Sequence, residues 1–488
     1  MAVSRKTRPA LAVVAVLALV TVGVVVWRIP SSDESRPAAA TTTTAAPATG
    51  LPGADGAGDP YYPTDGNAGY DVERYDVTVE YDPETKRLDG RTRVTATATA
   101  DLTGFNLDLY RLTVSEVEVA DTAARFRQEG DHELVVTPAA PIPTGTRFTV
   151  EVAYGGEPGL FPEKALGSNG WQISASGGAF AAGEPHSATT WFPANDTPRD
   201  KASFHLVATV PEGWSVVSNG RLGETTTAAG RTTVRWDAET PMATYLTTIA
   251  IDRWRIEKST ANGVEIVHAY APGAEKRTEL GERLPEVLEF LAGKFGPYPF
   301  DAAGGIFLSD RIGFSLETQT RPIYAAWADL DTVVHENAHQ WFGDSVTVDT
   351  WADICLNECF ASYASWLWDE AKNGADLDAA YRADVEKRSD KSWKHKLYDM
   401  GAGNEFKAVY DKGPLALHAL RRYVGDDAFD RILKGWVAKH TGGNASWPEF
   451  EKYAAETAGR DLDGFFAAWF RGDGVPADEY LWPGPLRR

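Results

Sequence analysis

Hydrophobic and polar residues alternate along the chain between about residue 70 and residue 255. The alternation is regular in residues 75–81, 92–98, 148–154 and 232–236, and turn residues separate these runs. β-Branched and aromatic residues at every second position are typical of half-buried strands in antiparallel sheets. The pattern therefore predicts an N-terminal antiparallel β domain over residues 60–256.

The hydrophobic period becomes helical after residue 274. Leucines and one valine recur at spacings of three and four within residues 279–294, which predicts an amphipathic helix there. Short strands are expected at residues 305–308 and 321–324, and helices at residues 414–423, 427–439, 447–458 and 461–470. Residues 257–488 are therefore predicted to form a mixed α+β domain that is mostly helical.

Two more helices are expected between these segments. The first would begin near Asp331 or Thr332, either of which can cap it, and would end at Gly343. The second would begin after residue 349 or 350 and end at Gly374, because glycine suits the position that follows a helix.

The first 28 residues read as a membrane segment. Arg5, Lys6 and Arg8 precede an uncharged run over residues 9–27, and Arg28 closes it. At a rise of about 1.5 Å per residue, such a run spans roughly the hydrocarbon core of a bilayer. The excess of positive charge before the run places the N-terminus in the cytoplasm. We therefore expect a single-pass anchor in the cell membrane with an extracytoplasmic catalytic domain; the alternative is a cleaved signal and a secreted protein.

Residues 29–59 are rich in Ala, Thr and Pro. Such a segment has too little apolar surface to offset its ordering entropy, so it is expected to be a disordered tether.

Composition narrows the function classes. The 488 residues are 43% hydrophobic and 24% charged, which is a globular balance with room for two domains. The formal net charge of -21 and the lack of a basic stripe argue against nucleic-acid binding, which needs clustered Lys and Arg. Nothing in the sequence indicates the oligomeric state.

The chain has two cysteines, Cys355 and Cys359, four positions apart on a predicted helix. At that spacing the Cβ atoms are about 5 to 6 Å apart, whereas a disulfide usually brings them to about 3.5–4.5 Å. We therefore expect two buried free thiols in preference to a bridge.

The candidate chemistry lies on the two helices. His335 and His339 are one helical turn apart on one face, where both imidazoles can hold one Zn²⁺. Glu336 follows the first histidine and can reach a water activated by the metal. Glu358, nineteen residues after His339, offers a third ligand from the next helix.

Three protein ligands leave a fourth zinc position open, which marks a catalytic site. A metal-activated water with Glu336 as general base predicts metal-assisted hydrolysis of an amide.

Residues 335–343, together with 356–358 and 360–363, closely resemble the zinc aminopeptidase N family of gluzincin metallopeptidases, whose motif is H-E-x-x-H followed eighteen residues later by Glu. Residues 69–77, 191–198 and 201–202 are similar to the family's N-terminal domain. The resemblance implies a thermolysin-like catalytic domain, one zinc ion per chain and peptide substrates with a free N-terminus. Because the chain ends about eighty residues after Tyr410, it resembles the short forms without the C-terminal helical-repeat domain.

The resemblance also implies roles for individual residues. His335, His339 and Glu358 would be the zinc ligands, and Glu336 the general base. Tyr410 stands in an element similar to Tyr-x-Lys-Gly and would donate a hydrogen bond to the reacting carbonyl oxygen. Glu317 takes the place of the glutamate in the Gly-Ala-Met-Glu-Asn motif and would bind the substrate amine, with Glu184 as a second amine-binding carboxylate.

The chain departs from the family pattern at three positions near the expected metal. Asn337 replaces an aliphatic residue, and Cys355 and Cys359 replace Trp and Gly.

The leading prediction is thus a zinc aminopeptidase that removes N-terminal residues from peptides. Two alternatives stay open: an endopeptidase or non-peptide hydrolase on the same zinc, and a catalytically silent binding module with the same fold.

Overall fold

The computed structural model describes residue 53, residues 56–162 and residues 166–487. Contacts group Ala48–Arg488 into one unit, so the predicted boundary near residue 256 stays a prediction. The predicted anchor and most of the predicted tether lie outside the described residues. The end of the tether differs from the prediction: Asp59 is buried and accepts a hydrogen bond from the Trp351 N–H at 2.9 Å, so the segment is ordered before residue 60. None of the described helices combines the length and hydropathy that a membrane span requires.

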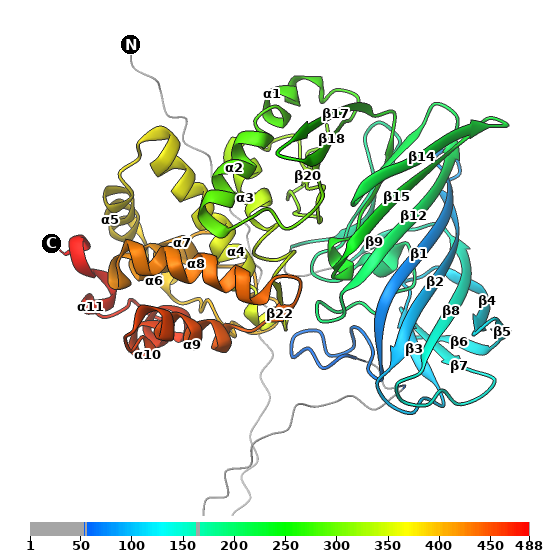
Figure 1. Ribbon diagram of the computed structural model, residues 1–488, viewed down its shortest axis with the longest axis horizontal. Coiled ribbons are helices and arrows are strands. Elements are labelled where there is room, and N and C mark those ends of the chain that lie inside the picture. The colour runs from blue at the N-terminus through cyan, green and yellow to red at the C-terminus, as the bar shows by residue number, and fades with distance from the viewer. Residues whose placement is uncertain (1–52, 54–55, 163–165, 488) are drawn as a thin grey trace, which may run out of the picture. The chain divides into compact units, whose positions relative to one another are not determined.

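An eight-stranded sheet dominates the N-terminal half (Figure 1). In spatial order its strands are β14 (Arg221–Ala228), β15 (Arg231–Met242), β12 (Ala202–Pro211), β1 (Tyr70–Asp82), β2 (Arg87–Ala98), β8 (Arg147–Gly156), β4 (Thr113–Val119) and β5 (Thr122–Ala123). All four runs of alternating residues lie in these strands, and β1 buries Val77, Val79 and Tyr81 on one face as alternation requires. The predicted β domain is confirmed.

One pairing in this sheet differs from the antiparallel prediction. Strands β1 and β12 run parallel, with Tyr75 opposite Phe204. Alternation shows only which residues share a face, because it is the same for both strand directions. The direction of β12 relative to β1 depends instead on the long connection between the two strands.

Two smaller sheets complete the β-rich half. One contains β13 (Ser215–Ser218), β16 (Ile249–Asp252), β11 (Ala179–Ala182), β10 (Asn169–Ile173) and β9 (Leu160–Phe161). The other contains β3 (Phe105–Asp108), β7 (Glu133–Thr137) and β6 (Arg125–Glu129).

The C-terminal half begins with a four-stranded sheet and continues in helices, as predicted. The sheet contains β17 (Arg255–Ala261), β18 (Val264–Tyr270), β19 (Ala302–Phe307) and β20 (Ile323–Tyr324). A separate pair joins β21 (Thr347–Val348) to β22 (Asn444–Ala445). The helices are α1 (Thr278–Gly281), α2 (Leu284–Phe295), α3 (Leu330–Ala338), α4 (Cys355–Trp368), α5 (Leu377–Lys387), α6 (Asp390–Trp393), α7 (Lys412–Val424), α8 (Asp426–His440), α9 (Trp447–Ala458), α10 (Asp463–Phe466) and α11 (Asp478–Leu481).

Arg321 links the two halves through a fully buried guanidinium group. On one side, its nitrogens donate to the carbonyl oxygens of Ser218, the last residue of β13, at 3.4 Å and of Gly220 at 2.6 Å. On the other side, they donate to the carbonyl oxygen of Val267 in β18 at 2.7 Å. Burial lowers the pKa of Arg321 to about 10, so the group stays charged at neutral pH. A buried charge is tolerated when its donors are satisfied, and here the donors join both halves.

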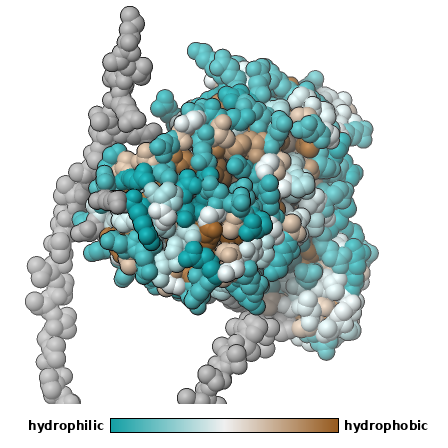
Figure 2. Space-filling model, turned by 60° about the vertical axis from the view of Figure 1, so that its left-hand side comes forward, coloured by the Kyte–Doolittle hydropathy of each residue, from teal (hydrophilic) through white to brown (hydrophobic). Residues whose placement is uncertain are grey.

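On the face in Figure 2, hydrophilic residues cover most of the surface, which agrees with the formal net charge of -21.

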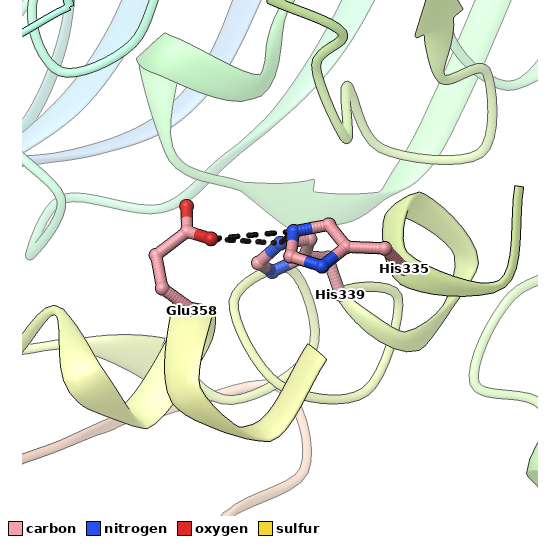
Figure 3. A group of neighbouring side chains, drawn as sticks. All are labelled: His335, His339 and Glu358. Carbon is pink, nitrogen blue, oxygen red and sulfur yellow. Dashed lines mark hydrogen bonds and ion pairs between the residues drawn. The ribbon is translucent and has the colours of Figure 1, made fainter. Parts of the chain in front are cut away.

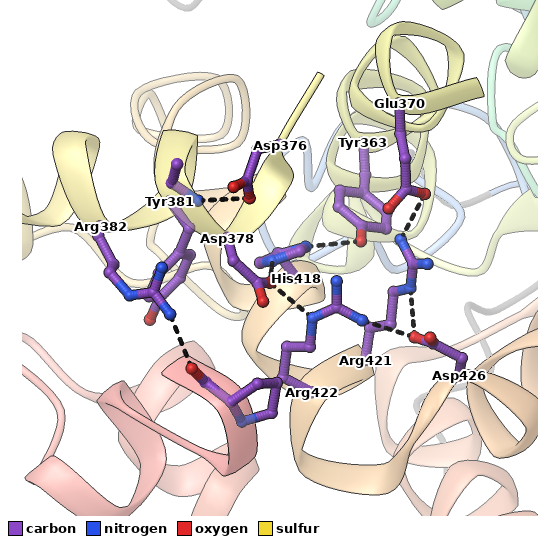
Figure 4. A network of polar contacts seen from close by, with 12 residues as sticks. Tyr363, Glu370, Asp376, Asp378, Tyr381, Arg382, His418, Arg421, Arg422 and Asp426 are labelled. Atoms are coloured by element: carbon purple, nitrogen blue, oxygen red, sulfur yellow. Dashed lines mark hydrogen bonds and ion pairs between the residues drawn. The ribbon is translucent and has the colours of Figure 1, made fainter. Parts of the chain in front are cut away.

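A buried polar network holds the helices around α4 (Figure 4). The Tyr363 hydroxyl on α4 lies 3.0 Å from His418 Nδ1 on α7, and His418 Nε2 lies 2.9 Å from Asp378 on α5. Arg422 donates to the same Asp378 oxygen at 2.7 Å. One neutral imidazole satisfies both contacts, accepting from the tyrosine at Nδ1 and donating to the carboxylate at Nε2.

The fully buried His418 makes stability depend on pH. Burial lowers its pKa to about 4, despite the opposing effect of Asp378. Between pH 6.5 and 4 the unfolded chain binds a proton that the folded chain does not, so stability present above pH 6.5 is lost as the pH falls, by on the order of 3 kcal/mol. We expect His418→Gln to lower the melting temperature at pH 7, and the difference from wild type to shrink toward pH 4.5.

Thermal unfolding monitored by circular dichroism across this range is the measurement. His395→Gln, at a partly exposed histidine, is the control and should follow wild type. If the melting temperatures of wild type and His418→Gln differ by the same amount at every pH, the lowered pKa of His418 is not the cause of the pH dependence.

Candidate active site

Helices α3 and α4 bring three metal-binding groups together (Figure 3). The Nε2 atoms of His335 and His339 are 3.1 Å apart. One Glu358 oxygen lies 3.3 Å from the first of these nitrogens and 3.6 Å from the second. Ligand atoms about 2.0–2.1 Å from a tetrahedral zinc ion lie about 3.3 Å from one another. The three groups therefore fit a zinc ion in both donor chemistry and spacing.

The hydrogen bond behind His339 prepares the ring for a metal. Its Nδ1 lies 3.0 Å from the carbonyl oxygen of Phe342, to which it can only donate. The proton is therefore on Nδ1, which leaves the lone pair of Nε2 free to bind a metal ion. Burial alone would raise the pKa of Glu358, but the two histidines lower it to about 2, so this carboxylate is charged.

Helix α3 is shorter than the sequence predicted. It begins at Leu330, because Asp329 caps it by accepting from the backbone N–H of Thr332 at 3.0 Å. It ends at Ala338, so His339 is the residue that follows the helix. The predicted end at Gly343 is wrong: this glycine has φ +131°, which no helix allows, and its N–H donates to Val346.

The two cysteines form a disulfide, so the expectation of free thiols is wrong. The Cα atoms of Cys355 and Cys359 are 4.8 Å apart, within the range that disulfides require. The prediction assumed regular helix geometry at both positions. Cys355 is instead the first residue of α4, and Ile354 alone separates it from the 3-10 turn η4 (Trp351–Asp353), so regular α-helix geometry does not extend to both sides of Cys355.

Asn337 does not face the metal. Its side-chain amide is buried and donates to the hydroxyl of Tyr324 in β20 and to the carbonyl of Val333, both at 2.8 Å. This departure from the family pattern therefore anchors α3 to the sheet and leaves the zinc ligands unchanged.

Glu184 and Glu317 meet beside the zinc ligands, as the resemblance implied. One oxygen from each lies within 4.8 Å of the other and of a Glu358 oxygen. Both side chains are buried, at 4% and 2% exposure, and the Oε1 atom of each has no hydrogen-bond partner among the described residues. Burial, and then the neighbouring Glu317 carboxylate, raises the pKa of Glu184 well above its usual value. A cation placed between them would remove this cost.

Glu336 is also buried, and one of its oxygens lies within 4.8 Å of Glu317 and His339 atoms. Burial is the largest cause that raises the pKa of Glu336 well above its usual value. A carboxyl group with a raised pKa is suited to take up a proton near neutral pH.

Tyr410 also lines the cavity, close to His335. Its ring centroid is 6.0 Å from that of His335, and 46% of the residue is exposed. It stands just before α7, whose Gly413 packs on α4 so closely that a Cβ atom there would lie 2.6 Å from Cys359 Sγ. Glycine at 413 thus lets the Tyr410 segment reach the site.

All seven residues proposed from the sequence line or adjoin one cavity of about 550 Å³. Sequence reasoning missed three residues that shape it. Gln340 positions the Glu317 segment, donating to the Glu317 carbonyl at 3.0 Å and accepting from the Thr320 N–H at 2.7 Å. Asp331 and Asp369 line the cavity farther from the metal ligands. The helical spacing of Asp331, four residues before His335, was the available signal.

Comparisons with known proteins agree with this architecture. Residues 71–246 match the Peptidase M1 N-terminal domain and residues 314–469 match the Peptidase family M1 domain. A two-domain M1 zinc metallopeptidase with bound L-arginine has a TM-score of 0.80 and 29% identity, covering 87% of this chain and 99% of that one. A Deinococcus radiodurans M1 zinc metallopeptidase with a Tyr-Ser-Ala substrate has a TM-score of 0.78, also at 29% identity, with coverage of 87% and 99%.

Curated relatives are longer than the segment that matches them. Aminopeptidase N of Lactococcus lactis is 26% identical over 444 residues, which is 83% of this chain and 51% of that protein. The chain spans between 35% and 51% of the length of the curated aminopeptidases that it matches.

A β-rich domain joined to a helical domain with a His-His-Glu site is the architecture of the two-domain zinc metallopeptidases. The chain belongs to the M1 peptidase family, as the motif predicted, and its cofactor is zinc.

Proposed function

We propose that the protein is a zinc aminopeptidase that removes N-terminal residues from peptides. The observation that carries the proposal is the buried pair Glu184 and Glu317, whose unpartnered oxygens lie next to the His335, His339 and Glu358 ligand set. A zinc site alone supports many hydrolytic reactions, whereas a buried anionic pocket beside it selects substrates that carry a positive charge at the reacting end.

The substrate amine would be bound by these two carboxylates. An N-terminal ammonium group donates up to three hydrogen bonds and pairs with both oxygens. Both glutamates are buried and line the cavity, so a chain whose ammonium they bind would extend from them toward the metal ligands. The first peptide bond is then the one that reaches the metal ligands, which limits cleavage to single N-terminal residues.

When bound, zinc supplies Lewis-acid chemistry that acidifies a water molecule and polarises a carbonyl group. Glu336 takes the proton that the attacking water loses and delivers it to the leaving nitrogen, so that the amide bond breaks and a neutral amine departs. The Tyr410 hydroxyl donates a hydrogen bond to the carbonyl oxygen as negative charge develops on it. Its exposure and its position beside His335 agree with a group that meets the substrate.

The relatives support the same substrate class. The solved structures with L-arginine and with Tyr-Ser-Ala hold a free amino acid and a peptide. The curated relatives include leucyl aminopeptidase of Saccharolobus solfataricus, with 26% identity.

Glu336→Gln is the direct test of the mechanism. We expect kcat on an alanyl arylamide to fall by about 10²- to 10⁴-fold, because an amide side chain cannot accept and return the proton. Zinc content, measured by elemental analysis, should stay at one ion per chain. Exposed Glu289 on α2 provides the matched control, and Glu289→Gln should keep wild-type activity. Full activity in Glu336→Gln would contradict the proposal.

Amine recognition is tested with paired peptides. We expect the enzyme to cleave Ala-Ala-Phe and to leave N-acetyl-Ala-Ala-Phe intact, since acetylation removes the charge that Glu184 and Glu317 bind. Glu317→Gln should raise KM for the free peptide. Peptide products are separated and quantified by liquid chromatography. Equal cleavage of both peptides would indicate an endopeptidase instead.

We also propose that the enzyme is held at the outer face of the cell membrane. The charge distribution around residues 9–27 supports an anchor, and a cleaved signal is the alternative. The full chain should sediment with membranes and require detergent for release, whereas a chain that begins at residue 53, and so keeps the hydrogen-bonded residues 56–59, should not. Recovery of a detergent-free protein whose mass lacks the first 28 residues would favour secretion.

A further inference from the structure

The active-site cavity continues past the metal ligands along both zinc-binding helices. On α3 and its C-cap the lining residues include Asp331, His335 and His339, each four positions from the next. Residues at this spacing lie on one face about 6 Å apart, so Asp331 lies one turn beyond His335. A carboxylate oxygen of Glu317 lies within 4.8 Å of a ring nitrogen of His339. Asp331 is therefore at the opposite end of this row from the proposed amine pocket.

The cavity also continues along helix α4, away from the metal ligands. Its cavity-lining residues are Glu358, Ser362, Ser365 and Trp366, and Asp369 follows at the end of the helix. These positions form one stripe that begins at the metal ligand and ends at a second carboxylate. The Ser365 hydroxyl donates to the Asp331 carbonyl at 3.1 Å, which joins the two helices at this level.

This end of the cavity is negatively charged. No lysine or arginine is among the described residues that line the cavity. Within the described chain, neither Asp331 nor Asp369 forms an ion pair. The carboxylate of Asp369 accepts one hydrogen bond there, from the amide of Asn373 at 2.7 Å. Partial burial, and then the neighbouring Asp369 and Asp329 carboxylates, raise the pKa of Asp331.

The direction of a bound peptide follows from the amine pocket. Glu184 and Glu317 are more than nine-tenths buried, and their unpartnered oxygens belong to the same cavity. With the ammonium there and the first peptide bond at the metal ligands, the second residue extends toward Asp331. An extended lysine side chain reaches about 6 Å, which is about one helical turn.

We propose that Asp331 and Asp369 form a subsite for a basic side chain on the second residue of the peptide, so that the enzyme favours substrates with Lys or Arg after the scissile bond. The inference rests on the proposed aminopeptidase function. The Trp366 ring in the same wall offers a face for the hydrocarbon stem and for the cation.

Peptides with lysine or its uncharged analogue norleucine at the second position test the subsite. We expect kcat/KM for Ala-Lys-Phe to exceed that for Ala-norleucine-Phe by about 10-fold at low salt, as for two partly exposed ion pairs, and the ratio to fall at high salt. The Asp331→Asn/Asp369→Asn variant should bring the ratio near one. Asp384→Asn, which removes an exposed charge on α5, should leave it unchanged.

Three results would overturn the proposal. A ratio near one in the wild type, with both peptides cleaved, rejects the subsite and leaves the aminopeptidase function standing. A ratio that the double variant does not change shows that other groups read the second residue. If the double variant alters selectivity between Lys-Ala-Phe and norleucine-Ala-Phe instead, the carboxylates read the first residue. Failure to cleave any peptide rejects the proposed function itself.

Discussion

The concentration of buried carboxylates in one cavity is the constraint on which this molecule depends. Glu184, Glu317, Glu336 and Glu358 are each at most 6% exposed, and they share their space with two imidazoles. Carboxylates in such surroundings are costly unless cations or protons offset their charge. Zinc meets part of that requirement, and in the proposed function a substrate ammonium would meet the rest. Metal binding and substrate selection would then both follow from the same buried charge.

The rest of the fold keeps these groups from moving apart. Helix α3, with the residue that follows it, and helix α4 supply the zinc ligands. A hydrogen bond from Asn337 to Tyr324 ties α3 to β20. A hydrogen bond between Tyr363 and His418 ties α4 to α7. The β-rich half contributes Glu184, and Arg321 joins that half to β18 by hydrogen bonds to carbonyl groups on both sides. Through Glu184, which follows β11 of the five-stranded sheet, the β-rich half forms part of the cavity wall. A fixed geometry matters because small displacements of reacting groups cost large factors in rate.

Much of the site could be predicted from the sequence because its parts are local. His335, Glu336 and His339 lie within one helical turn, where spacing determines which side chains share a face. Glu358 lies on the next helix, and its distance from that turn was typical of the family. The alternating strands were predictable for the same reason. Helix ends and the cysteine pair were predicted less well, since Asp329, Gly343 and Cys355 depart from the regular geometry that periodicity assumes.

The sequence by itself determined the three residues whose side chains fit a zinc ion, the position of Glu336 beside them, the strand pattern and the family, because each is encoded in short-range spacing or in a recognisable motif. Only the tertiary structure decided that β1 and β12 run parallel, that Glu184 and Glu317 meet at one end of a cavity, and that Asp331 and Asp369 line its extension. These residues come from segments far apart in the chain. Their proximity depends on how sheets and helices pack, and no local pattern of hydrophobic and polar residues carries that information.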